Sequence, residues 1–371
     1  MKKIVVLGAG LVGAPMALDL VKNNEFEVLV VDLNEHNFAK LGKAGVQTKK
    51  MNLSEKGAIE TVVKDADFVI NATPGFMGFE SLKRVIQSGK STIDIAFYPE
   101  DMFELDALAK EHGVCVISDI GVAPGMSNLL SAYGVTLLDT AEDIKIYVGG
   151  LPLKKELPWE YKAPFSPADV IEEYTRPARF VVDGQIVTKA ALTDGEILNF
   201  PVAGDLEAFN SDGLRSLMTT LKVPNMIEKT LRYPEYIDKI KLLRDSGFFD
   251  TETRIIDGKE IRPIDVTSSL LFDQWKLNDG DRDLTVMQIV VRGTKDGKPQ
   301  THVFDLYDEH DPASGIHSMA RTTGYSATAA ANLFLDGLFE EKGVFPPELV
   351  GKYENCFTYI LNYLEERNVN Y

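Results

Sequence analysis

A glycine-rich turn after an apolar run constrains the fold of this chain more than any other feature. Residues 3–7 (KIVVL) are typical of a short buried strand, and a G-x-G-x-x-G pattern follows directly. The first glycine of this pattern allows a tight bend, the second lets a pyrophosphate approach the backbone, and the third lets helix and strand pack closely. We therefore expect a dinucleotide at this turn, contacted by Gly8, Gly10, Leu11, Val12 and Gly13. These glycines also interrupt the apolar run, which argues against a secretory signal.

A second apolar run, residues 27–31 (EVLVV), ends in Asp32, nineteen residues after Gly13. A carboxylate at this distance can accept hydrogen bonds from the hydroxyl groups of the adenosine ribose. Its negative charge would repel a 2′-phosphate, so the sequence favours NAD over NADP. The alternative is a glycine-rich turn that binds no nucleotide. Pro15 places the start of the following helix near Leu11, because proline is tolerated only in the first turn of a helix.

The composition excludes several classes of protein. A length of 371 residues allows about two domains, and the formal net charge of −17 argues against a nucleic-acid partner. No apolar stretch is long enough to cross a membrane. Cys115 and Cys356 form no C-x-x-C pair, so the sequence predicts neither a disulfide framework nor a metal site. These features favour a cytoplasmic protein with a small-molecule partner and no membrane or nucleic-acid partner.

Strand-like and helical segments alternate through the first third of the chain. We expect strands around residue 47 and at residues 67–71, 92–96 and 114–119, and helices at residues 34–43, 54–63, 77–87 and 101–112. This alternation predicts an α/β fold with a Rossmann-type, doubly wound parallel sheet. Ligands bind at the carboxyl ends of such strands, although each polar residue there could singly belong to an ordinary turn. The expected cofactor site therefore extends to Asn71, Ala72, Pro74, Asp94, Ala96, Asp119 and Gly121.

The pattern changes after residue 125. Short runs at residues 144–148, 180–182, 186–188, 197–200, 260–263, 284–291 and 300–306 predict a mostly antiparallel sheet, with a hairpin around Asp296-Gly297. Helices are expected at residues 214–221, 237–244, 322–338 and 356–367. The alanine-rich third helix would pack closely on a sheet, so we expect the tail to return to the first domain. The sequence thus predicts a dinucleotide-binding domain of residues 1–125 with 322–371, and an inserted α+β domain of residues 126–321.

Several motifs along the chain resemble those of the saccharopine dehydrogenase-like family. They are DIGVAPGMSN at 119–128, YVGGLP at 147–152, EYTRPA at 173–178, EAFNSDGLR at 207–215, TLRYP at 230–234, TTGY at 322–325 and GVFPPE at 343–348. The resemblance covers nearly the whole chain and implies a second domain for substrate binding and oligomerisation. Within this family the chain is similar to lysine 6-dehydrogenases, whereas saccharopine reductases usually read G-x-D-P-G where this chain has Ala123.

The resemblance implies that NAD⁺ oxidises the ε-carbon of L-lysine, and that hydrolysis then yields allysine and ammonia. Hydride leaves only from a carbon that bears a neutral amine, so the reaction needs a general base. Asp119 and Glu100 follow strands that end near the expected nicotinamide site, and both are candidates. A helix cap or a cofactor contact is the alternative for Asp119, and a helix start is the alternative for Glu100.

The substrate's carboxylate calls for an arginine. Arg215, just inside a helix that residues 210–212 could cap, and Arg232 are the candidates, with Tyr98 and Asn210 as further substrate contacts. A buried ion pair is the alternative for Arg232, a core position for Tyr98 and a capping role for Asn210. His310, between two acidic residues, is a weaker candidate for a base than for a surface residue.

Two other functions stay open. The first is a saccharopine or carboxynorspermidine dehydrogenase, which would need a pocket for a second carboxylate. The second, from a different class, is a catalytically silent NAD-binding protein whose second domain serves only assembly. In either case we expect a homo-oligomer.

Overall fold

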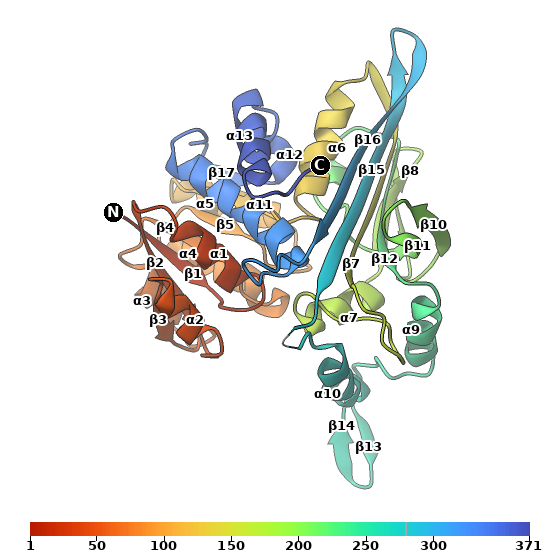
Figure 1. Ribbon diagram of the computed structural model, residues 1–371, viewed down its shortest axis with the longest axis horizontal. Coiled ribbons are helices and arrows are strands. Elements are labelled where there is room, and N and C mark those ends of the chain that lie inside the picture. The colour runs from red at the N-terminus through yellow and green to blue at the C-terminus, as the bar shows by residue number, and fades with distance from the viewer. Residues whose placement is uncertain (279) are drawn as a thin grey trace. The chain divides into compact units, whose positions relative to one another are not determined.

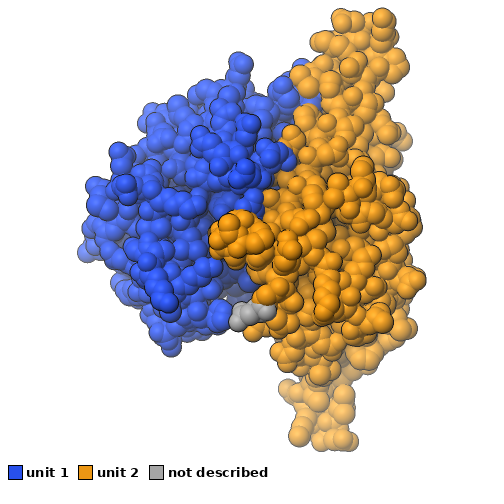
Figure 2. All heavy atoms as spheres, viewed as in Figure 1, with its two compact units in different colours: residues 1–136, 319–370 blue, residues 137–318, 371 orange. Residues whose placement is uncertain are grey.

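The computed structural model describes residues 1–278 and 280–371, which form two compact units (Figure 2). Unit 1 comprises residues 1–136 and 319–370, and unit 2 comprises residues 137–318 together with residue 371. The chain therefore leaves unit 1 once, builds unit 2 and returns. It leaves at residue 136 rather than 125, because helix α6 (Met126–Thr136) packs against α12 (Pro347–Val350) inside unit 1.

Unit 1 is built on a seven-stranded parallel sheet with the strand order β17-β6-β5-β4-β1-β2-β3 (Figure 1). The predicted doubly wound sheet is confirmed. Its strands are β1 (Lys2–Leu7), β2 (Phe26–Asp32), β3 (Gln47–Lys50), β4 (Phe68–Asn71), β5 (Thr92–Asp94), β6 (Cys115–Ser118) and β17 (Gly343–Phe345). The chain reverses its strand order between β1 and β4, and ligands bind at such a switch point, outside the carboxyl ends of the strands.

The helices of unit 1 come from both segments of the chain. Besides α6 and α12 they are α1 (Gly13–Leu20), α2 (Phe38–Lys43), α3 (Ala58–Val63), α4 (Gly75–Gln87), the 3₁₀ helix η1 (Met102–Leu105), α5 (Asp106–Glu111), α11 (Ser318–Leu335) and α13 (Glu354–Glu365). The helix predicted at residues 101–112 is thus divided into η1 and α5. None of the helices in the described part of the chain is long and apolar enough to span a bilayer.

A buried carboxylate ties the C-terminal segment to the start of the chain. Asp19 on α1 lies 2.9 Å from Nε of Arg367, and the two form an ion pair. The hydroxyls of Thr328 on α11 and Tyr363 on α13 both donate to Asp19 Oδ2 at 2.7 Å. A charge that is buried in the protein needs compensation. These contacts with Asp19 therefore hold α11 and α13 in unit 1. At Gly324 a Cβ would lie 3.1 Å from Met16, so the small residues of α11 let it approach α1 closely.

Unit 2 contains a mixed sheet with the strand order β10-β11-β12-β7-β15-β16, with β8 and β9 attached through β12. Among the strand pairs formed by the described residues, β12 and β7 alone are parallel, so the sheet is mostly antiparallel, as expected. The strands are β7 (Thr140–Pro152), β8 (Ala178–Val182), β9 (Gln185–Lys189), β10 (Glu196–Phe200), β11 (Gly204–Asn210), β12 (Asn225–Arg232), β15 (Asp283–Lys295) and β16 (Lys298–Glu309). β15 and β16 form the predicted hairpin around Asp296 and Gly297.

The helices of unit 2 surround an aromatic core. They are α7 (Pro167–Thr175), α8 (Leu217–Thr220), α9 (Tyr236–Asp245) and α10 (Pro263–Trp275), and a small hairpin of β13 (Arg254–Ile256) and β14 (Lys259–Ile261) precedes α10. Trp275 is fully buried and contacts the rings of Tyr161, Tyr174 and Tyr236. The strand predicted to reach Pro263 ends at Ile261, because proline opens α10 at its first position.

Candidate functional site

The glycine turn of unit 1 forms a cradle for phosphate groups. A Cβ at Gly8, where φ is +109°, would lie 2.4 Å from the Ala72 carbonyl oxygen, and a Cβ at Gly13 would lie 2.2 Å from the Gly8 carbonyl oxygen. Neither position can hold a side chain. Among the described residues, a Cβ at Gly10 would meet no atom within 4 Å, so the backbone there is open to a ligand. The first N–H groups of α1 lack intrahelical partners, and these residues therefore fit the pyrophosphate of a dinucleotide.

Asp32 lies beside this turn at the end of β2. Its Oδ2 accepts a hydrogen bond from the N–H of Ala9 at 2.6 Å, and its Oδ1 accepts one from the N–H of Asn34 at 2.7 Å. These bonds fix the carboxylate next to the turn, while its half-buried position leaves it accessible to ribose hydroxyls. Residues 33–37 (LNEHN) carry no lysine or arginine, and Lys50 on the neighbouring strand forms an ion pair with Glu35 at 2.7 Å.

A buried hydrogen-bond network joins the carboxyl ends of β4, β5 and β6. Asp94, the last residue of β5, accepts hydrogen bonds from Asn71 Nδ2 at 2.7 Å and from Ser118 Oγ at 2.9 Å. The hydroxyl of Tyr98 lies 2.8 Å from Ser118 Oγ, and Thr73 Oγ1 donates to Asn71 Oδ1 at 2.8 Å. Three strands that are adjacent in the sheet thus share one polar cluster.

Asp94 and Asp119 bring two carboxylates to this edge of the sheet. Burial raises the pKa of Asp94 to about 7, and the negative charge of Asp119 adds to the rise. Hydrogen bonds from Ser118, Asn71 and the N–H of Ala96 oppose it. Asp119 is itself buried and has a φ of +58°, a conformation that few residues other than glycine adopt and that is enriched at functional sites. Near neutral pH the carboxylate of Asp94 can therefore accept a proton.

The other predicted cofactor residues differ in accessibility. Leu11 and Pro74 are exposed, and Val12 and Ala72 are half-buried, so all four can be reached by a ligand at the turn. By contrast, Asn71, Asp94, Ala96 and Gly121 are buried. Asn71 and Asp94 hold the strand ends in place through the network described above.

Glu100 belongs to the exposed surface of unit 1, not to the buried network. Its side chain is exposed, and Asp101, not Glu100, caps the helix that follows by accepting a hydrogen bond from the N–H of Phe103 at 3.0 Å. The helix begins at Met102 with Asp101 as its N-cap, so the alternative role of Glu100 as the helix start is not observed. Tyr98 is fully buried, and its ring packs edge-on against Phe79 with the centroids 5.5 Å apart. Tyr98 is a core residue whose hydroxyl belongs to the network.

Arg232 of unit 2 is held in a buried ion pair. Its Nη2 lies 2.6 Å from Oε2 of Glu173 on α7, and its guanidinium lies over the ring of Tyr161, 4.6 Å from the centroid. Burial raises the pKa of Glu173, while the positive charge of Arg232 opposes that rise. For Arg232 the sequence left two roles open, a substrate contact and a buried ion pair. The structure contains the ion pair.

Arg215 does not lie inside a helix. Helix α8 begins only at Leu217, and Arg215 precedes it with a φ of +51°. The predicted helix at residues 214–221 was wrong at its start, because the polar residues before it bond to neighbouring strands instead of capping a helix. Asn210 Nδ2 donates to Oδ2 of Asp194 at 2.8 Å.

Asp212 and Ser211 make the remaining contacts of this segment. Asp212 binds Arg179 through both carboxylate oxygens, at 2.9 Å to Nε and 2.8 Å to Nη2. Ser211 Oγ donates to Oε2 of Glu228 at 2.7 Å. All three side chains that were expected to cap a helix are thus engaged elsewhere.

Glu228 is a titratable residue that sequence reasoning missed. It lies on β12, accepts a further hydrogen bond from the N–H of Gly213 at 3.0 Å, and burial raises its pKa to about 8. Met226, Glu228 and Thr230 alternate along the strand and are all buried. Lys229 and Leu231 between and beyond them are buried as well, so burial does not alternate along this strand and the sequence carries no periodic signal for the glutamate.

Comparison with models of protein families identifies the family to which this chain belongs. The family model for the saccharopine dehydrogenase C-terminal domain matches residues 121–369, and that for the saccharopine dehydrogenase NADP binding domain matches residues 4–117. The chain belongs to the saccharopine dehydrogenase family. The family resemblance of the sequence motifs is thereby confirmed.

Named members of the saccharopine dehydrogenase family share low identity with this chain over nearly its full length. A saccharopine dehydrogenase (NADP⁺, L-glutamate-forming) of Pyricularia oryzae is 24% identical and aligned over 93% of each chain. A carboxynorspermidine synthase of Vibrio cholerae is also 24% identical, over 93% of this chain and 91% of the relative. The solved structure of apo saccharopine dehydrogenase from Saccharomyces cerevisiae has a TM-score of 0.82 at 20% identity and covers 100% of this chain and 98% of that chain, which shows the same fold.

Membership of the saccharopine dehydrogenase family indicates which class of ligand binds at the phosphate cradle of unit 1. The chain is an NAD(P)-dependent dehydrogenase of that family, acting on amino-acid-like substrates. The turn at residues 8–13 and Asp32 are the residues that fit its cofactor.

Proposed function

We propose that this protein is an NAD⁺-dependent lysine 6-dehydrogenase. L-Lysine loses a hydride from its ε-carbon and a proton from its ε-nitrogen, and water then hydrolyses the imine to allysine (2-aminoadipate 6-semialdehyde) and ammonia. The observation that carries the choice of substrate is the pairing of arginines in unit 2. Arg232 is neutralised by Glu173, and Arg179 by Asp212. Saccharopine carries more carboxylates than lysine, and each carboxylate calls for a cation, so paired arginines favour lysine.

The first chemical task is removal of a proton from the substrate's ammonium group. A free lysine amine has a pKa of roughly 10.4, so neutralising it near pH 7.4 costs about 4 kcal/mol. Bound NAD⁺ supplies the hydride acceptor. We assign the base to Asp119, because it is buried at the carboxyl end of the sheet beside Asp94. The same carboxylate can then orient the water that attacks the imine.

The preference for NAD⁺ rests on Asp32. Its carboxylate is fixed by two backbone N–H groups at the place where the adenosine ribose lies in such folds. A 2′-phosphate there would meet this negative charge. The relative from Pyricularia oryzae is an NADP⁺ enzyme by its name, so the cofactor proposed for this chain differs from the cofactor of that relative.

A saccharopine or carboxynorspermidine dehydrogenase is the second candidate, since relatives of both kinds align over nearly the whole chain. Ala123 stands against saccharopine, because saccharopine reductases usually carry an aspartate there and this chain lacks that carboxylate.

The experiment is a measurement of nicotinamide reduction by the purified full-length protein. L-Lysine, saccharopine and carboxynorspermidine are compared with NAD⁺ and then with NADP⁺, and ammonia is measured in parallel. Reduction of NAD⁺ with lysine, with one ammonia released per nicotinamide reduced, supports the proposal. Activity on saccharopine or carboxynorspermidine alone supports the second candidate. Binding of NAD⁺ without turnover of any of them would leave a catalytically silent NAD-binding protein.

A further inference from the structure

Asp283, His310 and His317 bring three potential metal ligands together in unit 2. Nδ1 of His317 lies 3.1 Å from Oδ1 of Asp283 and 3.3 Å from Nδ1 of His310. One ligand atom from each residue lies within 4.8 Å of the other two. Ligand atoms around a tetrahedral zinc ion, at bond lengths of about 2.0–2.2 Å, are roughly 3.3–3.5 Å apart. Two of the three separations are therefore close to those of a zinc site.

The backbone holds these three side chains in place. Asp283 is the first residue of β15, and His310 directly follows β16 and donates its N–H to the Asp283 carbonyl oxygen at 2.8 Å. The loop at residues 311–316 is closed by the N–H of Asp311, which donates to the Ile316 carbonyl oxygen at 2.9 Å. His317 comes next, and the N–H of Ser318 donates to Oδ1 of Asp283 at 2.8 Å. The ligands are thus fixed by main-chain bonds.

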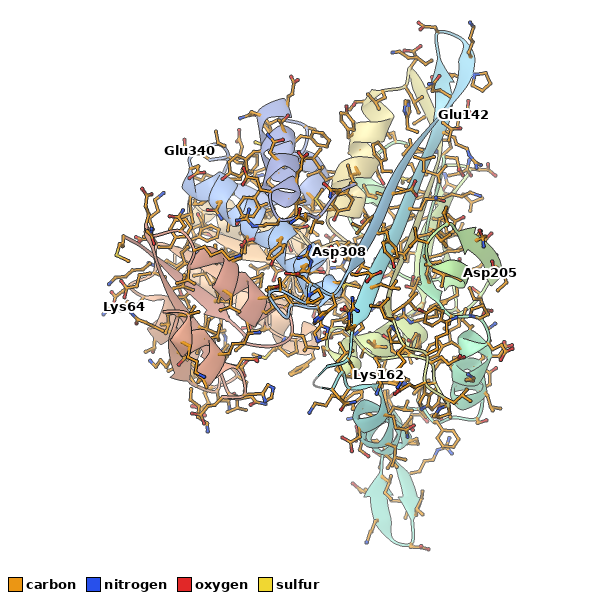
Figure 3. All side chains as sticks on the ribbon, viewed as in Figure 1. Lys64, Glu142, Lys162, Asp205, Asp308 and Glu340 are labelled. Atoms are coloured by element: carbon orange, nitrogen blue, oxygen red, sulfur yellow. The ribbon has the colours of Figure 1, made fainter. Side chains whose placement is uncertain are left out.

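The charge around the cluster favours a cation. Asp283 is buried, and Asp308, which is labelled in Figure 3, lies on β16 two residues before His310. Arg282 is the neighbouring cation, and its Nη2 lies 3.3 Å from Oε2 of Glu309.

Hydrogen bonds among Asp283, His310 and His317 account for the positions of their side chains less well than a bound metal ion does. One proton on Nδ1 of His317 can be donated to Asp283, but within the described part of the chain Nδ1 of His310 would then have to accept from that same N–H. The rings stand 4.9 Å apart at 64°, so the two nitrogens converge and the rings do not stack. A metal ion would accept a lone pair from each of the three residues.

We propose that Asp283, His310 and His317 bind one divalent transition-metal ion of the zinc type. Asp283 contributes a carboxylate oxygen, and each histidine contributes Nδ1. Three protein ligands leave the fourth tetrahedral position for water or another small ligand. The ion would fasten the loop between β16 and α11 to the first residue of β15. The three residues belong to unit 2, whereas the strand-end network belongs to unit 1, and the metal proposal does not depend on which substrate the enzyme uses.

The test is calorimetric titration of the untagged, chelator-treated full-length protein with zinc chloride. We expect one zinc ion per chain and a higher thermal unfolding midpoint with zinc. His317→Ala and Asp283→Asn should each weaken binding by about 100-fold or more, because each removes one of three ligands. His36→Ala removes an exposed histidine of unit 1 and should bind zinc as the native protein does.

Two results would overturn this site. One is the absence of zinc binding to the native protein. The other is binding of unchanged affinity and stoichiometry in both ligand variants. Loading the native protein with Co²⁺ tests the site without any variant that could fail to fold. Intense visible d–d absorption supports a tetrahedral site, and its absence at saturating Co²⁺ contradicts the proposal.

Discussion

Gly10 and Gly13 belong to one turn but have opposite surroundings. A Cβ at Gly13 would collide with the Gly8 carbonyl oxygen, whereas a Cβ at Gly10 would project away from the described part of the protein. Gly13→Ala should therefore lower the free energy of unfolding by about 2 kcal/mol or more. Gly10→Ala should leave that free energy within about 0.5 kcal/mol and weaken NAD⁺ binding. Urea unfolding and NAD⁺ titration of both variants measure this, and equal destabilisation by both would contradict the cradle.

On sequence alone Asp119 and Glu100 are both candidates for the base, with a helix start the stronger alternative for Glu100. Asp119 is buried next to Asp94, and Glu100 is exposed. We expect Asp119→Asn to lower kcat on lysine by about 100-fold or more, which is typical of losing a general base. Glu100→Gln should stay within about twofold of the native kcat, because surface substitutions have small effects. The reverse order of these two kcat values would refute the assignment of the base.

Because of Asp94, the free energy of unfolding should change with pH in the direction opposite to the change caused by an aspartate whose pKa is lowered on folding. Its pKa is raised from 3.8 to about 7 in the folded protein. Between these values the folded state keeps a proton that the unfolded state releases, so stability falls as pH rises from about 4 to about 7. The loss is on the order of 4 kcal/mol. Asp94→Asn should remove this fall, measured by urea unfolding at pH 5 and pH 8. An identical pH dependence in the native protein and the variant would contradict it.

The ion pair between Asp19 and Arg367 joins helix α1 to the end of α13. Asp19 is fully enclosed, so removing Arg367 leaves its buried charge with the longer ion pair to Lys22 at 3.4 Å. We expect Arg367→Leu to lower the free energy of unfolding by about 3 kcal/mol. Adding Asp19→Asn should recover part of that loss, since the uncompensated charge is gone. A double variant less stable than the sum of its single variants would exclude this explanation.

At the level of helices and strands, the sequence predicts the type of each element better than its length. Apolar runs gave β1, β2 and β4 within a residue or two, because both faces of a parallel sheet are buried. The helices expected at residues 34–43 and 54–63 are observed as the shorter helices α2 and α3. Each of them begins four residues later than expected. Helices α7 and α10 went unrecognised, although each begins with a proline at its first position.

Sequence patterns describe the candidate site where local backbone determines its geometry, and not where partners distant in sequence do. The glycine spacing and Asp32 are local features, and their geometry agrees with a cofactor turn. The partners of Arg232 and Asp212 lie 59 and 33 residues away, and sequence patterns give no information on such pairing. The same is true of Asp283 and His317, which are 34 residues apart.

At the scale of the molecule, unit 1 depends on both ends of the chain. Residues 1–136 supply six strands of its sheet, and β17 arrives only after unit 2 has been completed. Asp19 also receives its partners from residues 319–370. A chain cut after residue 136 would leave the edge of β6 unpaired and Asp19 without Arg367. Integrity of the whole chain is therefore a condition for the dinucleotide cradle.

The central claim is hydride transfer from the ε-carbon of lysine to NAD⁺. The most direct measurement uses L-lysine with deuterium at C6 only, and L-lysine with deuterium at C2 only, with product NADH examined by mass spectrometry. The account predicts that deuterium appears in NADH from the C6-labelled lysine and not from the C2-labelled lysine. Deuterium transferred from C2 would mean that the α-amine is oxidised, and the proposed reaction would be wrong.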